Sequence, residues 1–216
     1  MQPYVIYGAA GSGSVPVEAA LTLMGAPFEV VEGATWSRDP EILARVGAVN
    51  PMKQIPALVI PAGEVVTESA AILLWLTEQH PDAGLAPPPG DPLRAQFLRW
   101  MVYLPAAIYS LYWIRDDPTR LCPSELAEQV KRRTADRIVD CWRMMDEQLE
   151  PGDYLLGDRL SVLDLYVAVV SRWGPRRRRF YEAAPKMAGV VRRVDQDPRL
   201  AGFWARRFPF ESGWEG

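Results

Sequence analysis

The chain is poor in cysteine and histidine, with two Cys and one His among 216 residues. Cys122 and Cys141 are too few and too irregularly spaced for a disulfide framework or a cysteine-based metal site. A strong charge of one sign is also missing, because 24 basic and 27 acidic residues leave a net charge of −3. A dedicated nucleic-acid-binding domain usually carries a basic excess. These shortages disfavour a secreted disulfide-rich protein, a zinc-ribbon protein and a dedicated nucleic-acid-binding protein.

Long hydrophobic runs are missing as well. The longest apolar run in the helical segments spans residues 70–76, whereas a membrane-spanning helix needs roughly 20 apolar residues. The first residues do not combine a basic stretch, an apolar stretch and a cleavage site, so no secretory leader is expected. Hydrophobic residues still make up 49% of the chain and charged residues 24%, which suffices for a substantial core. We therefore expect a cytoplasmic globular protein without a membrane segment.

The first eighty residues alternate short strand-like and helix-like segments. A helix is predicted to start at Ser14-Val15-Pro16 and to end at Gly25, because proline suits a first helical turn and glycine a helix end. The order βαβ, α, ββα predicts a small sheet with parallel and antiparallel pairs, covered by helices. The predicted strands are 4–7, 28–31, 57–60 and 65–66, and the further helices are 39–46 and 68–79.

A proline-rich segment separates this half from the rest of the chain. Residues 80–92 contain five prolines and two glycines, which is typical of a linker. We predict three parts: a mixed α/β domain at 1–79, a linker at 80–91 and an all-helical domain at 92–216. In the last part an apolar period of 3.6 residues predicts helices near 92–115, 124–149, 161–173, 182–195 and 197–207.

Three short motifs carry a specific resemblance. Residues 50–58 read Asn-Pro-Met-Lys-Gln-Ile-Pro-Ala-Leu, Glu68-Ser69 follows, and residues 157–164 read Gly-Asp-Arg-Leu-Ser-Val-Leu-Asp. In combination they resemble the glutathione S-transferase family, over nearly the whole chain. The resemblance implies a thioredoxin-like N-terminal domain followed by an all-α domain, in which Ser161 and Asp164 form a helix capping box. It also implies a bacterial, serine-type cytosolic transferase with glutathione as co-substrate and no metal.

The resemblance assigns the segment before Pro56 to glutathione binding. In thioredoxin-like domains this X–Pro bond is cis, and the N–H and C=O of the preceding residue, here Ile55, pair with an extended peptide such as glutathione. A trans proline that opens an edge strand is the alternative, because only about 5–6% of X–Pro bonds are cis; the surrounding motif favours cis. Gln54 is expected to donate an N–H to the glycine carboxylate of glutathione. Whether Lys53, which replaces the family's usual glycine, also contacts it stays open.

Glu68 and Ser69 are the second part of the implied glutathione site. Ser69 is predicted at a helix N-terminus, where free N–H groups and the helix dipole favour an anion such as the γ-glutamyl α-carboxylate. Glu68 suits the amino group beside that carboxylate. Alone, Thr-Glu-Ser would be interpreted as a plain helix cap. Its position ten residues beyond the 50–58 motif favours binding.

Catalysis in this family requires the glutathione thiol to be held as thiolate. A free thiol has a pKa of about 8.5, and a hydroxyl that donates a hydrogen bond to sulfur favours the anion. Family members use Ser, Tyr or Cys after the first strand. We favour Ser12, because the loop glycines let the backbone approach the sulfur. Ser14, otherwise a helix N-cap, and Tyr7, otherwise a core aromatic, remain alternatives, and the lack of a loop cysteine disfavours thiol-transferase chemistry.

The resemblance also implies partners. The electrophile is expected to be small and apolar and to bind between the domains, with walls from 92–115. A homodimer is expected to form through helices 92–115 and 124–149. From the residues alone, Arg176–Arg179 is expected to be a solvated loop between helices, with an anion or partner site as the alternative. Alternatives in function are a glutathione-dependent isomerase or dehalogenase and a non-catalytic binding protein of the same fold. The side chains suggested for the dimer contact are Trp100, Met101, Tyr103, Trp142, Met144 and Met145.

Overall fold

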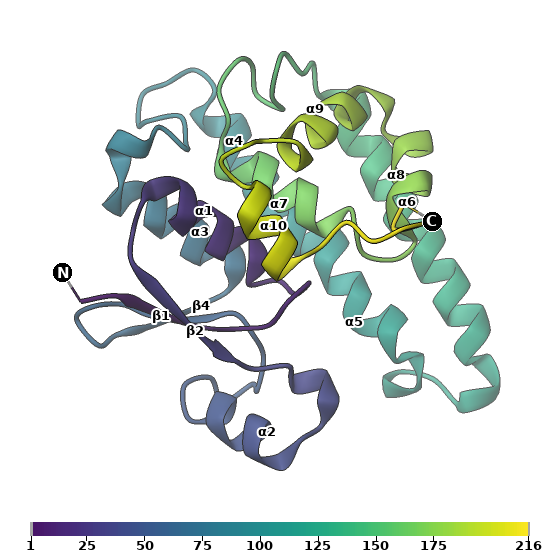
Figure 1. The fold of residues 1–216 in the computed structure, drawn as a ribbon. Helices are drawn as coiled ribbons and strands as arrows, with labels where there is room; N and C mark the ends of the chain where they lie inside the picture. Colours follow the sequence, from purple (N-terminus) through teal and green to yellow (C-terminus); the bar gives the residue numbers. More distant parts are fainter. Residues whose placement is uncertain (1, 216) are drawn as a thin grey trace. The chain divides into compact units, whose positions relative to one another are not determined.

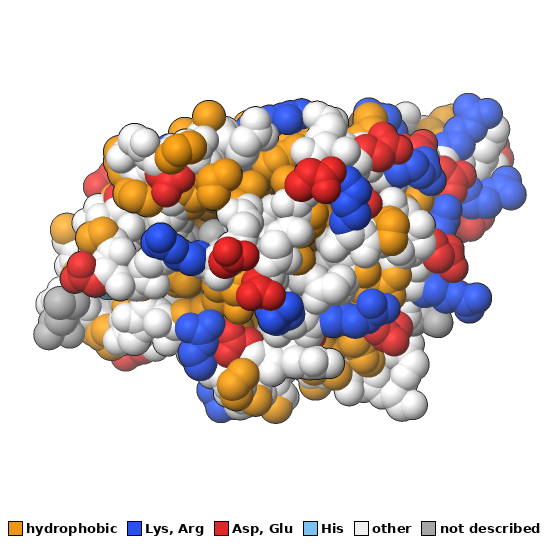
Figure 2. Space-filling view, turned by 90° about the horizontal axis from the view of Figure 1, so that it is seen from above, with side chains coloured by type: hydrophobic (Ala, Val, Ile, Leu, Met, Phe, Trp, Pro, Cys, Tyr) orange, Lys and Arg blue, Asp and Glu red, His pale blue; other side chains and the backbone are white. Residues whose placement is uncertain are grey.

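The computed structural model describes residues 2–215, which divide into two units (Figure 1). The first unit contains the residues up to Ala86 together with Asp195–Phe210, and the second contains Pro87–Val194 together with the residues from Glu211. Acidic and basic side chains are interspersed on the face drawn in Figure 2, as the near balance of charge predicts. No helix among the described residues is long and apolar enough to cross a membrane.

A four-stranded sheet forms the centre of the first unit, in the order β2-β1-β3-β4. β1 pairs in parallel with β2, and the two pairs β1–β3 and β3–β4 are antiparallel. Along β1 the side chains of Tyr4 and Ile6 are buried, with the alternation expected of a strand. The predicted mixed sheet is thus confirmed. The strands are β1 Tyr4–Gly8, β2 Phe28–Glu32, β3 Ala57–Val59 and β4 Val65–Thr67.

Helices cover this sheet from both sides. α1 (Val15–Met24) and α3 (Ser69–Gln79) pack against each other on one side, and α2 (Pro40–Gly47) lies on the other (Figure 1). α1 has a proline in its first turn and ends at Gly25, whose φ of 63° lies in the left-handed region that glycine adopts without strain. Both signals predicted the helix correctly.

The last helix belongs to the first unit and not to the helical half. α10 (Ala201–Arg207) packs against α1, and the Gly11 N–H donates to the Arg207 carbonyl at 2.8 Å. The segment 195–210 therefore departs from the predicted domain 92–216. The helical period identified the apolar face of this helix but contains no information on which partner covers it.

Helices build the second unit, as predicted. The first predicted helix, 92–115, is continuous but irregular: Leu104–Tyr109 is π-helical, because Pro105 has no N–H to donate to the preceding turn. The helices are α4 Arg94–Tyr103, α5 Ser110–Asp116, α6 Ala127–Gln148, α7 Val162–Val170, α8 Arg176–Ala183 and α9 Pro185–Asp195. Among residues 2–215 the short 3-10 helices are Thr35–Ser37, Pro81–Ala83, Pro118–Arg120 and Ser124–Leu126.

The arginine run 176–179 is not the solvated loop that the sequence predicts. It forms the first turn of α8, and the predicted helix 182–195 is two helices. Arg177 is fully buried and donates to the Ala168 carbonyl at 2.6 Å and to the Tyr181 hydroxyl at 3.1 Å. A guanidinium tolerates this burial because it has five donors and flat faces that stack on aromatic rings, here Trp214 at 5.2 Å.

The side chains suggested for a dimer contact are mostly core residues. Trp100, Met101 and Met145 are completely buried within the chain, and Trp142 is 1% exposed. This basis for a dimer interface is therefore wrong, because apolar positions of a helix pack first against the helices of their own chain. The capping box is confirmed at the start of α7, where Ser161 and Asp164 form it.

Candidate active site

The loop after β1 contains two serines whose hydroxyl groups are hydrogen-bonded. Ser12 Oγ and Ser14 Oγ lie 2.9 Å apart, and both residues are buried, Ser12 with 7% of its surface exposed and Ser14 with none. The Ser12 oxygen also accepts N–H bonds from Ser14 at 3.1 Å and from Ala9 at 3.3 Å. Hydrogen bonds accepted by a hydroxyl oxygen polarise its O–H and strengthen it as a donor.

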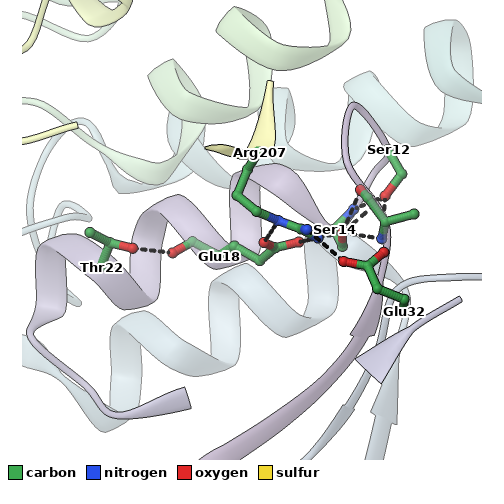
Figure 3. Close-up of polar contacts among 7 residues, drawn as sticks. Ser12, Ser14, Glu18, Thr22, Glu32 and Arg207 are labelled. Atoms are coloured by element: carbon green, nitrogen blue, oxygen red, sulfur yellow. Dashed lines mark hydrogen bonds and ion pairs between the residues drawn. The ribbon is translucent and has the colours of Figure 1, made fainter. Parts of the chain in front are cut away.

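Ser14 is tied to a buried ion pair (Figure 3). Its hydroxyl donates to Glu18 Oε1 at 2.6 Å, and Glu18, fully buried in α1, receives Arg207 Nε on Oε2 at 2.5 Å. Arg207 also donates to Glu32 Oε1 at 2.6 Å. Burial lowers the pKa of the Arg207 guanidinium, but its bonds to Glu18 and Glu32 outweigh burial, so the pKa is raised. The arginine stays charged and neutralises the buried carboxylate.

Two glycines make this arrangement possible. A Cβ on Gly8 would lie 2.3 Å from Ser14 Oγ, so only glycine leaves room for that hydroxyl at the end of β1. Gly11 has a φ of 69°, in the left-handed region, and its main chain faces the ring of Phe208. The glycine-rich loop predicted from the sequence thus gives Ser14 space and lets the C-terminal segment approach the backbone.

Asn50 organises the loop that precedes Pro56. Its side chain is buried, donates to the Gln54 carbonyl at 2.9 Å and accepts the Met52 N–H at 3.1 Å. Lys53 has a φ of 53°, which explains why a glycine is usual at this position in the family pattern. Lys53 and Gln54 are both exposed.

The Ile55–Pro56 peptide bond is cis, which confirms the prediction. Within residues 2–215 the main-chain N–H and C=O of Ile55 form no hydrogen bond, although Ala57, two residues further on, enters the sheet. The Ile55 side chain is half-buried and lies close to Gly33. Ile55 thus presents a main-chain donor and acceptor at a sheet terminus, as a peptide-binding segment requires.

Ser69 is the first residue of α3, as predicted. It is 6% exposed, whereas Glu68 before it is exposed and has a φ of 66° and a ψ of 110°. This non-helical backbone turns the chain from β4 into α3. The first turn of α3, the positive end of the helix dipole, therefore begins beside an exposed carboxylate.

Strand register brings the three segments to one end of the sheet. Tyr7 of β1 pairs with Ala57 of β3, and Ala57 pairs with Thr67 of β4. Because β3 runs opposite to its two neighbours, the loop after β1, the Ile55–Pro56 segment before β3 and Glu68 after β4 emerge at the same end. Tyr7, the next-to-last residue of β1, is half-buried and lies at this end of the sheet too. The alternative in which Tyr7 activates the thiol is therefore compatible with the same location.

Three residues that organise the site were not singled out by the sequence analysis. Asn50 belongs to the 50–58 motif, but the motif assigns it no role, and no motif contains Glu18 or Arg207. A signal existed for Glu18: it is the only charged residue in the apolar run of residues 15–21, and a buried charge requires a partner. Arg207 gives no local signal, because it lies 189 residues further along the chain.

Residues 12–79 match the family model of the glutathione S-transferase N-terminal domain, and residues 122–207 match that of the C-terminal domain. The chain belongs to the glutathione S-transferase family. It is 31% identical over 195 residues to an uncharacterized GST-like protein of Escherichia coli K12, YncG, covering 90% of this chain and 94% of that protein. Membership confirms the resemblance found in the motifs and the predicted fold class.

Solved structures of glutathione transferases have the same fold. A glutathione transferase homolog from Sulfitobacter with bound glutathione superimposes with a TM-score of 0.82 at 24% identity, over 95% of this chain and 98% of that one. A sphingomonad glutathione S-transferase complexed with glutathione gives 0.76 at 26% identity, over 92% and 96%. Both of those relatives bind glutathione.

Proposed function

We propose that this protein is a glutathione transferase that holds the glutathione thiol as thiolate for attack on a small apolar electrophile. The observation that carries the proposal is the strand register, which gathers the loop of Ser12, the free main chain of Ile55 and the start of α3 at one end of the sheet. The segments that carry the proposed glutathione-binding motifs therefore lie at the same end of the sheet. The family membership and the glutathione-bound relatives support the same ligand.

Each part of glutathione has a proposed partner. Ile55 pairs with the cysteinyl main chain, and Gln54 donates to the glycine carboxylate. Glu68 receives the γ-glutamyl amino group, and the α-carboxylate lies on Ser69 at the positive end of α3. These partners bind and orient the peptide, which converts the attack into a reaction within one complex.

Ser12 is the proposed catalytic residue. Its oxygen already accepts two N–H bonds, so its O–H, 2.9 Å from Ser14 Oγ in this structure, turns from Ser14 toward the bound sulfur and stabilises the thiolate. The thiol proton leaves to solvent, and the sulfur lone pair then forms the new bond to the electrophilic carbon. In a substitution the leaving group departs with the electron pair of its bond to that carbon. In an addition the π electron pair moves to the neighbouring atom, which takes a proton from solvent. Ser14 is less suited to this role, because it is completely buried and its hydroxyl donates to Glu18.

Ser12→Ala tests the catalytic assignment. Loss of a hydrogen bond to a charged group, about 1.5–3 kcal/mol, should raise the pKa of the bound thiol by about 1–2 units. Glutathione affinity should change little, because the lost bond is mainly to the thiolate. The thiolate is titrated by its ultraviolet absorbance, with Tyr7→Phe and Ser14→Ala as matched controls. A titration that moves only with Tyr7→Phe would make the enzyme tyrosine-type, and binding without any lowered thiol pKa would favour a non-catalytic binding protein.

Ser69→Ala tests the binding assignment. Loss of a charge-assisted contact of about 1.5–3 kcal/mol should weaken glutathione binding roughly ten- to a hundredfold. Isothermal calorimetry measures this directly, and unchanged affinity would refute the proposed carboxylate position. Thr67→Val, at the last residue of β4, is the neighbouring control and should bind as the unaltered protein does.

We further propose that the chain is cytoplasmic and forms a homodimer. The buried tryptophans and methionines do not serve as the contact, but Leu98 and Val102 of α4 are 38% and 58% exposed and lie one helical turn apart. Light scattering at micromolar concentration decides between twice the chain mass and 24.2 kDa. Val102→Glu should favour the monomer, and cell fractionation tests the location.

A further inference from the structure

Arg207 holds the Ser12 loop through both its main chain and its side chain. Its carbonyl accepts the Gly11 N–H at 2.8 Å, one residue before Ser12. Its guanidinium binds Glu18, to which Ser14 donates its hydroxyl. The ring of the next residue, Phe208, covers Gly11. The loop is therefore fastened on both sides of Ser12 by one short C-terminal segment.

The ion pair also fixes the direction of the hydroxyl hydrogens. A carboxylate only accepts, so Ser14 gives its single hydroxyl proton to Glu18 at 2.6 Å. At the 2.9 Å contact between the two serines, Ser14 can then act only as acceptor and Ser12 is the donor. With N–H groups on its oxygen, Ser12 can contribute only its single O–H, which points to Ser14 here. To stabilise a bound thiolate this O–H turns from Ser14 to the sulfur, and Ser14 Oγ keeps the Ala9 N–H as a donor.

We propose that Arg207, at the end of α10, is a positioning residue for thiol activation by the Ser12 loop. This inference rests on the proposed function of Ser12. Arg207 acts in two ways that have the same sign: it anchors Gly11 and Glu18, and it cancels the negative charge of Glu18 near the place where the thiolate forms. Substitution of the Arg207 side chain keeps the carbonyl bond to Gly11 but removes the guanidinium from Glu18, so the loop loses its side-chain anchor and the uncompensated carboxylate repels the thiolate.

The side chain must be arginine for geometric reasons. One guanidinium donates from Nε and Nη2 to Glu18 and from Nη1 to Glu32, so it bridges α1 and the end of β2 at once. A lysine ammonium retains the charge but lacks this planar fork. Arg207→Lys therefore preserves neutralisation in part while it loosens the bridge, and it is the variant most compatible with folding.

The experiment compares Arg207→Lys and Arg207→Met with Arg206→Lys and Arg206→Met. Arg206 is the exposed neighbour on the same helix and serves as the matched control. Thiolate absorbance of bound glutathione gives the thiol pKa, calorimetry gives the affinity, and urea unfolding gives stability. We expect the thiol pKa to rise by about one unit in Arg207→Met, a tenfold smaller ratio of thiolate to thiol, and by less in Arg207→Lys. Affinity should stay within about threefold, because Ile55, Glu68 and Ser69 lie on other segments.

The outcomes separate this inference from the proposed function. If both Arg207 variants are less stable but leave the thiol pKa where it is in the unaltered protein, Arg207 is only structural and the inference is overturned. Arg207→Lys alone decides the matter if Arg207→Met does not fold. If the unaltered protein does not bind glutathione, or Ser12→Ala leaves the thiol pKa unchanged, the proposed function itself fails. If Ser12→Ala shifts the pKa of the bound thiol but neither Arg207→Lys nor Arg207→Met does, only the inference about Arg207 is refuted.

Discussion

Replacing Asp164 by asparagine should remove a pH dependence from the stability of the helical unit. Asp164 is completely buried at the start of α7. Its carboxyl accepts N–H bonds from Leu155 and Ser161, each at 2.8 Å, and the Ser161 hydroxyl at 2.7 Å. Burial raises its pKa from 3.8 to about 6, because the loss of solvation outweighs the hydrogen bonds that favour the anion.

The size of the effect follows from the two pKa values. Between pH 3.8 and about 6 the folded chain keeps a proton on Asp164 that the unfolded chain releases. The free energy of unfolding therefore falls as the pH rises through this window. A difference of about two pKa units at 1.36 kcal/mol each gives about 3 kcal/mol, fully present below the lower pKa and lost above the higher one.

The assay is urea unfolding of the unaltered protein and of Asp164→Asn between about pH 4 and about pH 8, followed by tryptophan fluorescence. The amide cannot ionise, so the difference in unfolding free energy between the two proteins isolates Asp164. We expect the advantage of the unaltered protein to shrink by about 3 kcal/mol as the pH rises. A constant difference, or one that grows with pH, would refute the reasoning: the three donors would then outweigh burial and hold the carboxylate ionised.

Further variants test how the site and the core are built. Gly8→Ala should destabilise the first unit by about 1–3 kcal/mol in urea unfolding, because its methyl group would overlap the hydroxyl of Ser14. Asn50→Ala should weaken glutathione binding about tenfold by calorimetry, since the loop up to Ile55 loses its side-chain anchor. Asp146→Ala should lower the unfolding free energy by about 1–3 kcal/mol, because the buried Met187 N–H loses its acceptor, whereas Asp146→Asn retains one.

The features that the sequence predicts well are those encoded within a few residues. The start of α1 has Pro16 in the first turn, its end has Gly25, and both signals act on the local backbone. Ser161 and Asp164 are three residues apart and cap α7 as expected. The 50–58 motif likewise predicts the cis bond before Pro56. The start of α3 at Ser69 is also encoded locally, by the Thr-Glu-Ser sequence at the end of β4.

The features that the sequence does not predict depend on partners far along the chain. Arg177 looks like part of a solvated charge run, yet carbonyl and aromatic groups of α7, α8 and the C-terminal segment enclose it. Trp100 and Trp142 fit a dimer contact by type, but both are buried within their own chain. Apolar character predicts burial and does not say whether the covering surface comes from the same chain or from another.

Two buried charged residues show the same dependence on distant partners. Glu18 and Arg177 both lie completely out of solvent, a state that is costly for an unpaired charge. Each therefore requires a partner that the fold must deliver, and for Glu18 that partner is Arg207, 189 residues away. A lone charge in an apolar helical run is thus a sequence signal that some distant residue is fixed beside it. Glu18 lies one helical turn after Ser14 and accepts its hydroxyl. Arg207, which pairs with Glu18, is therefore also connected to the loop that contains Ser12. The ion pair and the main-chain bond to Gly11 thus both join α10 to the N-terminal unit.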